Sequence, residues 1–432
     1  MTELAVAAPT HAEISTNPRE HAILGQLQKS PSDAVSKQEL VDLSEKAGDP
    51  EKAKALTAKD STTFAEFVTA FKKAGQKVEG TGNCLGIAAQ DKEGVLAPWK
   101  FDRRKPRESD VVVQIVYSGM CHSDYHQIHG EWKMDYHFPM IPGHEIVGIV
   151  TEVGSKAAKF KVGQRVGVGV YVEACLSCKT CEADAHPYCG KLVLSYNCTD
   201  SKGDVMYGGY STQIVVDEKY AFHIPSSIDF AGAAPLLCAG ITVYSPLRFY
   251  GLDKPGMKVG VLGLGGLGHM TIKFLKSFGC HVTVISRSTA KEKDARENLK
   301  VDDYIASSDT DRMQKAARSL DGIVDCVSAL HDPNPYISLL GLNGKYVLVS
   351  LPAEPMPVDA FSLVAQRISM GGSLVGGLEE TQEMLDYCGE KHIWSDVEMV
   401  RADQVNEAME RLLRGDVKYR FVIDVQGSLL KE

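Results

Sequence analysis

The sequence predicts an α/β protein made of two unlike parts, a β-rich part followed by a parallel βαβ sheet. Short apolar runs punctuated by Gly and Pro begin at about residue 82, and from about residue 240 apolar runs alternate with helical stretches. A third observation is that the first 81 residues are polar and show no strand-like alternation. At about 100–200 residues per domain, the 432 residues give room for about two to four domains.

The composition excludes several classes of protein. Hydrophobic residues make up 44% and charged residues 24%, as in an ordinary globular protein. The 47 Lys and Arg against 56 Asp and Glu give a formal net charge of −9, which argues against nucleic acid or an anionic membrane as the main partner. Because no apolar run approaches the roughly 18 residues that span a bilayer, we expect no membrane segment.

Residues 1–81 are predicted to form a helical or partly disordered extension. Ser36 with Glu39 and Thr63 with Glu66 have the spacing of a capping box at the start of a helix. The apolar stripe of the second helix would consist of Phe64, Phe67, Val68 and Phe71. We expect the extension to pack on the main body or to stay partly disordered; a partner-binding segment is the alternative.

The β-rich part begins at about residue 82. Its small strands are predicted at residues 111–116, 146–150 and 165–170, where Val and Ile dominate. In the following part, strands are predicted at residues 258–262, 281–285, 321–326 and 345–350, with a helix at residues 269–278. Alternation of strands and helices favours a parallel sheet.

A glycine-rich turn, Gly263-Leu-Gly265-Gly-Leu-Gly268, lies between the first of these strands and the helix. In this strand–turn–helix setting the pattern is typical of a dinucleotide site. The first glycine makes the tight turn, the second lets the backbone approach a pyrophosphate, and the third lets helix and strand pack closely. The free N–H groups of the helix N-terminus would face the phosphates.

The end of the next strand favours NADP(H) over NAD(H). A site for NAD usually carries Asp or Glu about 20 residues after the glycines, to bind the ribose 2′-hydroxyl. Here the strand ends in Ser286, Arg287 and Ser288, and Lys291 follows one turn later. Arg can hold a phosphate through two parallel hydrogen bonds, whereas the alternative is that both cations are merely solvated.

Four of the eleven cysteines are clustered, at Cys175, Cys178, Cys181 and Cys189. The N-terminus shows neither a secretory pattern nor an Arg-rich, acid-poor transit peptide, so a reducing, cytoplasmic location is expected, where clustered thiols are metal ligands. Four thiolates can close a tetrahedron around a structural Zn²⁺ ion. Disulfides in an oxidising compartment and an iron–sulfur cluster are the alternatives.

A second set of candidate ligands is dispersed along the chain. Cys121 and His144 lie in the β-rich part, and Cys238 follows much later, so that spacing alone does not assemble them. Each one singly is more often a buried thiol or a hydrogen-bonded histidine. Two thiolates and one imidazole would match the Cys₂His catalytic zinc of alcohol dehydrogenases, which keeps a fourth position open.

Several motifs together resemble one family. The segments Gly119-Met-Cys121-His-Ser-Asp-Tyr-His126, Pro142-Gly-His144-Glu145 and Gly376-Gly-Leu-Glu-Glu-Thr-Gln occur in the order of the cinnamyl-alcohol-dehydrogenase branch of the zinc-dependent medium-chain dehydrogenases, with the four-cysteine lobe and the glycine turn between them. The resemblance covers residues 82–432. It implies a GroES-like catalytic domain, residues 82–238 and 377–432, around a Rossmann domain, residues 239–376, usually in a homodimer.

The resemblance also implies the site residues and two zinc ions per chain, one catalytic and one structural. Catalytic zinc ligation is carried onto Cys121, His144 and Cys238, with Glu145 as an acidic neighbour that can approach the metal. Contacts to NADP(H) are carried onto Ser123, Thr242, Gly263, Leu264, Gly265, Gly266, Leu267, Gly268, Ser286, Arg287, Ser288, Lys291, Cys326, Ser373, Leu374 and Val375.

Two departures from the lignin-type enzymes argue against cinnamyl specificity. Leu194 stands where those enzymes carry a large aromatic side chain in the substrate pocket. The loop after His126 is one residue longer than in the plant enzymes and contains Glu131 and Trp132. The extension before residue 82 lies outside the family pattern.

The function predicted is the interconversion of aldehydes and primary alcohols with NADP(H), cinnamyl-type or as a broad aldehyde reductase. Zinc would act as a Lewis acid, and Ser123 would relay the alcohol proton through the cofactor ribose to His126, whose ordinary pKa near 6.5 suits a shuttle. A polyol or secondary-alcohol dehydrogenase and a non-catalytic NADPH-binding protein are the alternatives.

Overall fold

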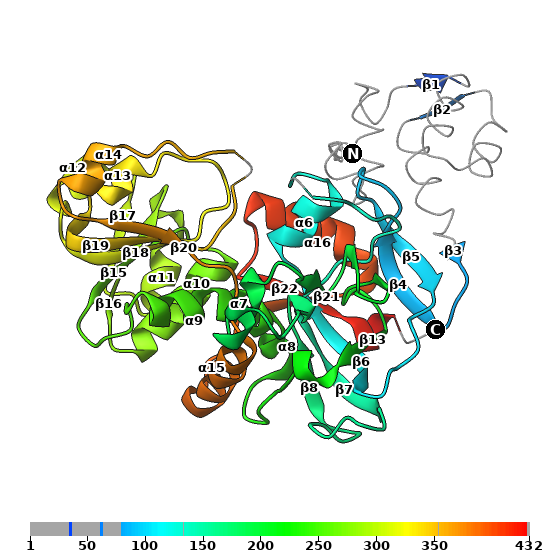
Figure 1. The fold of residues 1–432 in the computed structure, drawn as a ribbon. Coiled ribbons are helices and arrows are strands. Elements are labelled where there is room, and N and C mark those ends of the chain that lie inside the picture. The colour runs from blue at the N-terminus through cyan, green and yellow to red at the C-terminus, as the bar shows by residue number, and fades with distance from the viewer. Residues whose placement is uncertain (1–33, 37–60, 64–78, 133, 353, 430–432) are drawn as a thin grey trace.

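The computed structural model describes residues 34–36, 61–63, 79–132, 134–352 and 354–429. Figure 1 shows two parts side by side, a β-rich part and a parallel sheet flanked by helices. This arrangement confirms the predicted α/β class with two unlike parts.

The β-rich part is organised around a mixed seven-stranded sheet. Its order is β14 (Ala221–His223), β8 (Arg165–Val168), β7 (Ile146–Val153), β6 (Asp110–Gly119), β22 (Arg420–Asp424) and β21 (Val397–Val400), with β13 (Gln213–Asp217) also paired to β6. The three predicted strands are therefore present, although the third ends at Val168 rather than at residue 170. Strands β21 and β22, from the end of the chain, join this sheet and bring distant residues beside β6.

Smaller elements surround this sheet. They are the sheet of β3 (Glu79–Gly80), β4 (Cys84–Ala89) and β5 (Leu96–Phe101), the pairs β9 (Tyr171–Glu173) with β10 (Val193–Leu194) and β11 (Cys198–Thr199) with β12 (Val205–Met206), and the helices α6 (His122–Ile128), α7 (Lys179–Glu182), α8 (Phe230–Ala233), α16 (Val405–Arg414) and α17 (Val425–Ser428). Helix α6 follows β6 directly and carries several of the candidate site residues.

The second part is a six-stranded parallel sheet. Its order is β17 (Asp303–Ala306), β16 (His281–Ser286), β15 (Lys258–Leu262), β18 (Leu320–Asp325), β19 (Leu340–Leu348) and β20 (Ser369–Gly372). Numbered along the chain this is 3-2-1-4-5-6, the order of a doubly wound dinucleotide-binding sheet, as predicted. Its helices are α9 (Ala239–Phe249), α10 (Gly266–Ser277), α11 (Glu292–Glu297), α12 (Thr310–Lys315), α13 (Asn334–Ile337) and α14 (Ala360–Val364). Helix α15 (Leu378–Lys391) packs against both α9 and β14, and so contacts both parts.

Element boundaries differ from the predictions by a few residues. Helix α10 begins at Gly266, inside the glycine turn, rather than at residue 269, because the glycines themselves form its first turn. Strand β19 begins at Leu340 and ends at Leu348, earlier than the predicted range of 345–350.

In the extension, the two described segments β1 (Ala34–Ser36) and β2 (Ser61–Thr63) form an antiparallel pair, which the polar composition did not predict. The helices predicted after Ser36 and Thr63 lie outside the described residues.

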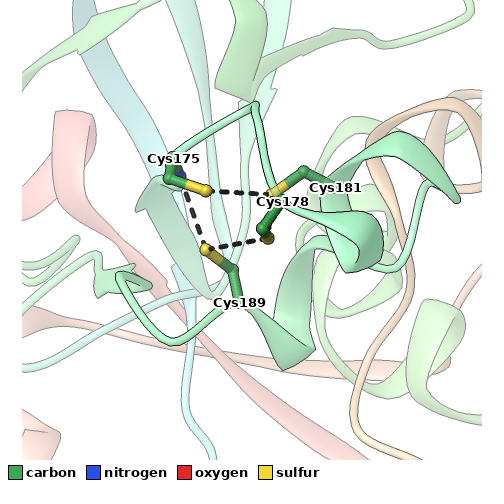
Figure 2. A group of neighbouring side chains, drawn as sticks. All are labelled: Cys175, Cys178, Cys181 and Cys189. Carbon is green, nitrogen blue, oxygen red and sulfur yellow. Dashed lines mark hydrogen bonds between the residues drawn. The ribbon is translucent and has the colours of Figure 1, made fainter.

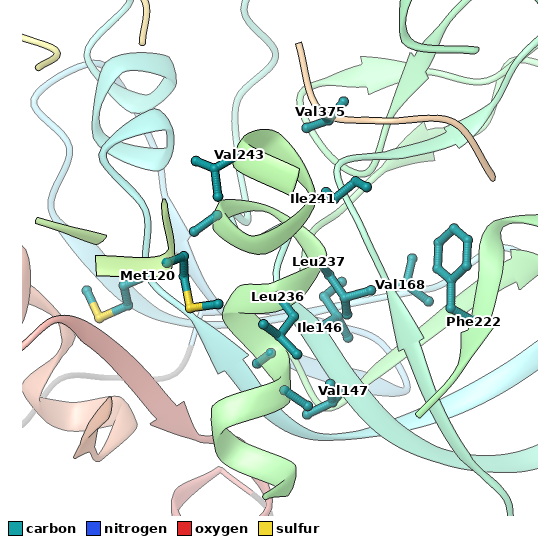
Figure 3. Packing of buried hydrophobic residues seen from close by; sticks show 14 of the residues in the cluster. Met120, Ile146, Val147, Val168, Phe222, Leu236, Leu237, Ile241, Val243 and Val375 are labelled. Carbon is teal, nitrogen blue, oxygen red and sulfur yellow. The ribbon is translucent and has the colours of Figure 1, made fainter. Parts of the chain in front are cut away.

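One hydrophobic core runs from the mixed sheet into the second part. Leu236 and Leu237 are almost completely buried and pack with Ile146, Val168 and Ile241 (Figure 3). Burying a Leu side chain contributes about 1.5–3 kcal/mol. Because Cys238 comes next in the chain, this packing fixes the position of its thiol.

Within the described part of the chain, no single helix has the length and hydropathy to cross a membrane. A bent pair, Phe230–Leu237 with Ala239–Phe249 at 55°, meets these two criteria only when its halves are taken together.

Candidate active site

Four side chains from three distant stretches meet where the mixed sheet contacts the 3-10 turn Ala234–Leu237 that leads into α9. The sulfurs of Cys121 and Cys238, a ring nitrogen of His144 and a carboxylate oxygen of Glu145 all lie within 4.8 Å of one another. None of the four residues is more than 8% exposed. Cys121 precedes α6, His144 and Glu145 precede β7, and Cys238 precedes α9, so three elements converge on one point.

Asp124 orients this cluster from behind. It is fully buried, and its Oδ1 accepts hydrogen bonds from His144 Nδ1 and from the backbone N–H of Gly143, each at 3.1 Å. Its Oδ2 accepts from the N–H of Cys121 and from the hydroxyl of Tyr210, each at 3.0 Å. With Nδ1 committed to a carboxylate, Nε2 of His144 is free to bind a metal, the arrangement usual for zinc-binding histidines.

The charges of the cluster suit a cation. The pKa of the Cys121 thiol lies well below its ordinary value, because the Cys238 thiol donates to it and Arg420 is nearby, which together outweigh burial. Donation to Cys121 and burial hold the pKa of Cys238 well above its ordinary value. Burial raises the pKa of Glu145 to about 7 in spite of Arg420, and Glu145 Oε2 is buried without a hydrogen-bond partner among the described residues.

Two thiols, an imidazole and an orphaned carboxylate oxygen are a donor set that fits Zn²⁺. Protons must leave the thiols when a metal binds, so affinity for the metal depends on pH. The sequence assigned the three ligands and Glu145 by resemblance, and the structure places all four together.

The second cluster consists of the four cysteines predicted as a structural metal site, and Figure 2 shows their side chains converging. The sulfur–sulfur distances are 3.5 Å for Cys178–Cys181 and 3.9 Å for both Cys175–Cys181 and Cys178–Cys189. Four sulfurs at the Zn–S distance of about 2.3 Å in a tetrahedron lie about 3.8 Å apart, whereas disulfide sulfurs are about 2.05 Å apart. A hydrogen bond with the hydroxyl of Thr180 lowers the pKa of Cys178 to about 6, which favours a thiolate.

The glycine turn connects β15 to α10. Gly263 has φ +89°, and a Cβ at Gly268 would lie 2.0 Å from the carbonyl oxygen of Gly263, so helix and strand pack too closely for a side chain. A Cβ at Gly265 would meet no described atom within 4 Å. No side chain caps the N-terminus of α10, which leaves its first N–H groups available to phosphate oxygens.

Arg420 joins the glycine turn to the first cluster. Its guanidinium is buried, lies 2.5 Å from Glu145 Oε1 and 3.5 Å from Cys121 Sγ, and would be 2.6 Å from a Cβ on Gly266. No pattern in the sequence marks this residue, since it comes from β22, some 300 positions after Cys121. The dinucleotide turn and the candidate metal site are thus contiguous.

The residues expected at the ribose phosphate lie at the end of β16. Arg287 and Ser288 are exposed, and Arg287 forms no ion pair with any described residue. Lys291 turns back and donates to the carbonyl oxygen of Leu264 at 2.9 Å, and burial lowers its pKa. Arg287 is therefore the cation that is free for an anion here, whereas Lys291 braces the glycine turn.

The two candidate relay residues lie on α6. Ser123 Oγ is 3.6 Å from Cys121 Sγ, and His126 is one turn further along the same helix face. Nδ1 of His126 contacts Glu131 Oε2 at 2.5 Å, and its ring stacks on Trp132 at 5.3 Å. Nε2 of His126 is buried without a hydrogen-bond partner in the described part of the chain. Glu131 and Trp132, noted in the sequence only as an altered loop, therefore hold this imidazole.

The other predicted cofactor contacts lie at the carboxyl ends of strands or near Cys238. Cys326 follows β18, and Ser373 follows β20. The N–H of Ser373 donates to the carbonyl oxygen of Leu348 at 3.0 Å. Thr242 is buried and its N–H donates to the carbonyl oxygen of Cys238 at 2.9 Å. The carboxyl ends of a parallel sheet are where dinucleotides bind.

Known proteins share this organisation. A family model described as an alcohol dehydrogenase GroES-like domain matches residues 107–226, and one described as a zinc-binding dehydrogenase matches residues 266–390. An 8-hydroxygeraniol dehydrogenase of Catharanthus roseus is 51% identical over 353 residues, which cover 82% of this chain and 98% of that protein.

A mannitol dehydrogenase of Petroselinum crispum is 51% identical over 338 residues, which cover 78% of this chain and 100% of that protein. Among solved structures, a cinnamyl alcohol dehydrogenase of Helicobacter pylori in complex with NADP(H) has a TM-score of 0.75 and 38% identity, covering 80% of this chain and 99% of its own.

Proposed function

The chain belongs to the zinc-dependent medium-chain alcohol dehydrogenases, in their cinnamyl-alcohol-dehydrogenase-like branch, and from this membership we propose that it interconverts aldehydes and primary alcohols with NADP(H). The observation that supports the proposal most is the contiguity of the Cys121, His144 and Cys238 cluster with the glycine turn through Arg420. Residues 82–238 with 377–432 would form the catalytic domain, and residues 239–376 the cofactor domain.

Cys121, His144 and Cys238 would hold the catalytic zinc, with Glu145 as an alternating fourth ligand. A bound zinc would supply Lewis-acid polarisation of the substrate oxygen, and NADPH would supply the hydride. Asp124 keeps the His144 ring in the orientation that presents Nε2. The four-cysteine lobe would hold the second, structural zinc.

Reduction of an aldehyde consumes one hydride and one proton. Ser123, beside Cys121, would donate the proton to the substrate oxygen, and His126 would restore it. Glu131 holds Nδ1 of His126, so Nε2, which has no hydrogen-bond partner among the described residues, would be the nitrogen that exchanges the proton.

NADP(H) is proposed over NAD(H) because no carboxylate stands at the end of β16 and Arg287 is free. Replacing Arg287 by Asp should lower the ratio of kcat/KM for NADPH over NADH by about 100-fold, since a charged hydrogen bond is replaced by repulsion. Initial rates with both coenzymes test this, and Lys202→Asp, the same charge change on an exposed residue of the other part, is the control. An unchanged ratio in R287D would refute the assignment.

A polyol is a second candidate substrate class, which the similarity to the Petroselinum mannitol dehydrogenase favours. The test is a panel of aliphatic and aromatic aldehydes with NADPH, run beside a panel of primary alcohols and mannitol with NADP⁺. Turnover of aldehydes and primary alcohols supports the proposal. Preference for mannitol would favour the polyol function, and no turnover despite bound NADPH would favour a non-catalytic protein.

A homodimer is proposed through the edge of the parallel sheet. Strand β20 is its last strand, and near this edge Leu342, Phe361 and Val364 are 70–78% exposed. Unpaired edges and exposed apolar groups favour pairing with a second copy across a twofold axis.

Replacing Val364 by Glu should therefore halve the molar mass measured by light scattering, since it places a charge in the apolar interface. The control is Val162→Glu, an equally large change at a residue that is 64% exposed in the other part. A dimeric V364E, or a wild-type chain that is already monomeric, would contradict this proposal.

A further inference from the structure

The four-cysteine lobe, residues 175–189, contacts the segment 374–380, which runs from the connection after β20 into the first turn of α15. We propose that the lobe is a positioning element for the nicotinamide half of the cofactor, acting through Asp184 and Tyr188 on this segment. The inference rests on the proposed function, because it requires that residues 373–375 contact the cofactor.

The topology assigns this segment to the nicotinamide half. Arg287, proposed for the ribose phosphate, follows β16, and the glycine turn follows β15, whereas the segment follows β20 at the other end of the sheet. A doubly wound sheet binds one mononucleotide half on each side of its first strand. A Cβ on Gly376 would lie 2.6 Å from Ile241 Cδ1 in α9, three residues after Cys238, so this end also lies near the candidate metal cluster; Figure 3 labels Ile241 and Val375 in this region.

The backbone of the segment is strained. Val375 has φ +40°, in the left-handed region, which is costly for a β-branched residue. Such conformations persist only where the surroundings hold them, and they concentrate at binding and catalytic sites. The contacts that hold Val375 therefore indicate what positions the segment.

Two phenols hold the residues on either side of Val375. The hydroxyl of Tyr188, in the lobe, accepts from the N–H of Leu374 at 3.1 Å. The hydroxyl of Tyr171, which is buried in β9, donates to the carbonyl oxygen of Gly376 at 3.0 Å. Each neighbour of the strained residue is thus fixed by a tyrosine from the β-rich part.

Asp184 supplies the missing cap of α15. The N-cap residue Gly377 has no side chain, and instead Asp184 Oδ1 accepts from the N–H of Glu379 at 3.1 Å and Oδ2 from that of Glu380 at 3.0 Å. A Cβ on Gly377 would lie 1.8 Å from the carbonyl oxygen of Asp184, so lobe and helix are in direct backbone contact. Because Asp184 lies between Cys181 and Cys189, the cysteine cluster sets where this cap stands.

The test compares Asp184→Ala with the wild-type chain by titrating NADPH and 2′-phospho-ADP-ribose, which lacks the nicotinamide, with bound zinc measured in both proteins. We expect D184A to weaken NADPH binding by about tenfold, the size of effect that loss of a helix N-cap gives, and to leave binding of the fragment within about twofold. Asp184→Asn keeps one acceptor oxygen, so its affinity for NADPH should lie between those of D184A and the wild-type chain. Glu182→Ala removes an exposed carboxylate on α7 and should bind both NADPH and the fragment as the wild type does.

Equal NADPH affinity in D184A and wild type, or an equal loss for the fragment, would overturn the positioning role. If D184A does not fold, Tyr188→Phe replaces it. We expect Y188F to lose NADPH affinity selectively, by less than D184A, and an unchanged NADPH affinity would contradict the inference. A wild-type chain that binds the fragment but catalyses no aldehyde turnover would instead contradict the proposed function, and the affinity comparison would still decide the role of the lobe.

Discussion

Replacing Cys121 by Ser should lower the NADPH-dependent rate of aldehyde reduction by about 10³-fold, because Lewis-acid activation by zinc lowers the activation free energy by several kcal/mol and would be lost. A serine hydroxyl does not provide the thiolate that the cluster favours at this position, where the pKa of Cys121 is held low by Cys238 and Arg420. Affinity for NADPH should stay within about twofold, since the dinucleotide turn is built from other residues.

The matched control is Cys280→Ser, at another buried cysteine. Its thiol already contacts the carbonyl oxygens of Leu252 and Lys254, which a serine hydroxyl can also reach, so its rate should equal that of the wild type. Full activity in C121S would rule out this cluster as the catalytic metal site, whether the variant has lost one bound zinc ion or has kept both.

Replacing Arg420 by Gln should lower the free energy of unfolding by about 3 kcal/mol, because breaking a buried ion pair leaves Glu145 without its counter-charge. Both side chains are almost completely buried, so water cannot compensate. The measurement is the free energy of unfolding from denaturant titration of the chain after zinc has been removed, because bound zinc would itself supply a counter-charge to Glu145.

The controls for this prediction are Glu145→Gln alone and the double variant with Arg420→Gln and Glu145→Gln. Removing both charges should recover much of the loss, since two neutral amides need no charge partner. A double variant that is as unstable as the two single losses combined would show that the ion pair is not what stabilises this contact.

Much of the fold and part of the site follow from local sequence patterns. The glycine turn is readable because strand, turn and helix are adjacent in the chain, and the four-cysteine lobe because its ligands lie within 15 residues. The ligands Cys121, His144 and Cys238 are dispersed, and only the resemblance to a family joined them before the structure did.

The residues that the sequence analysis missed act across long separations. Arg420 reaches Glu145 from 275 positions away, and Asp184 caps a helix that begins 194 positions later. No periodicity marks such pairs, because they exist only once β22 lies beside β6 and the lobe lies beside α15. Asp124 was readable as part of a motif, but its role as the partner of His144 depends on how α6 and β7 converge.

The initial rate of NADPH oxidation with an aldehyde, measured before zinc removal, after it and after zinc is added back, tests the central claim most directly. We predict a loss of about 10³-fold on removal, recovery on addition, and binding of 2′-phospho-ADP-ribose that persists throughout, because the glycine turn and Arg287 do not include the zinc ligands. A rate that is unchanged after both zinc ions have been removed would contradict it.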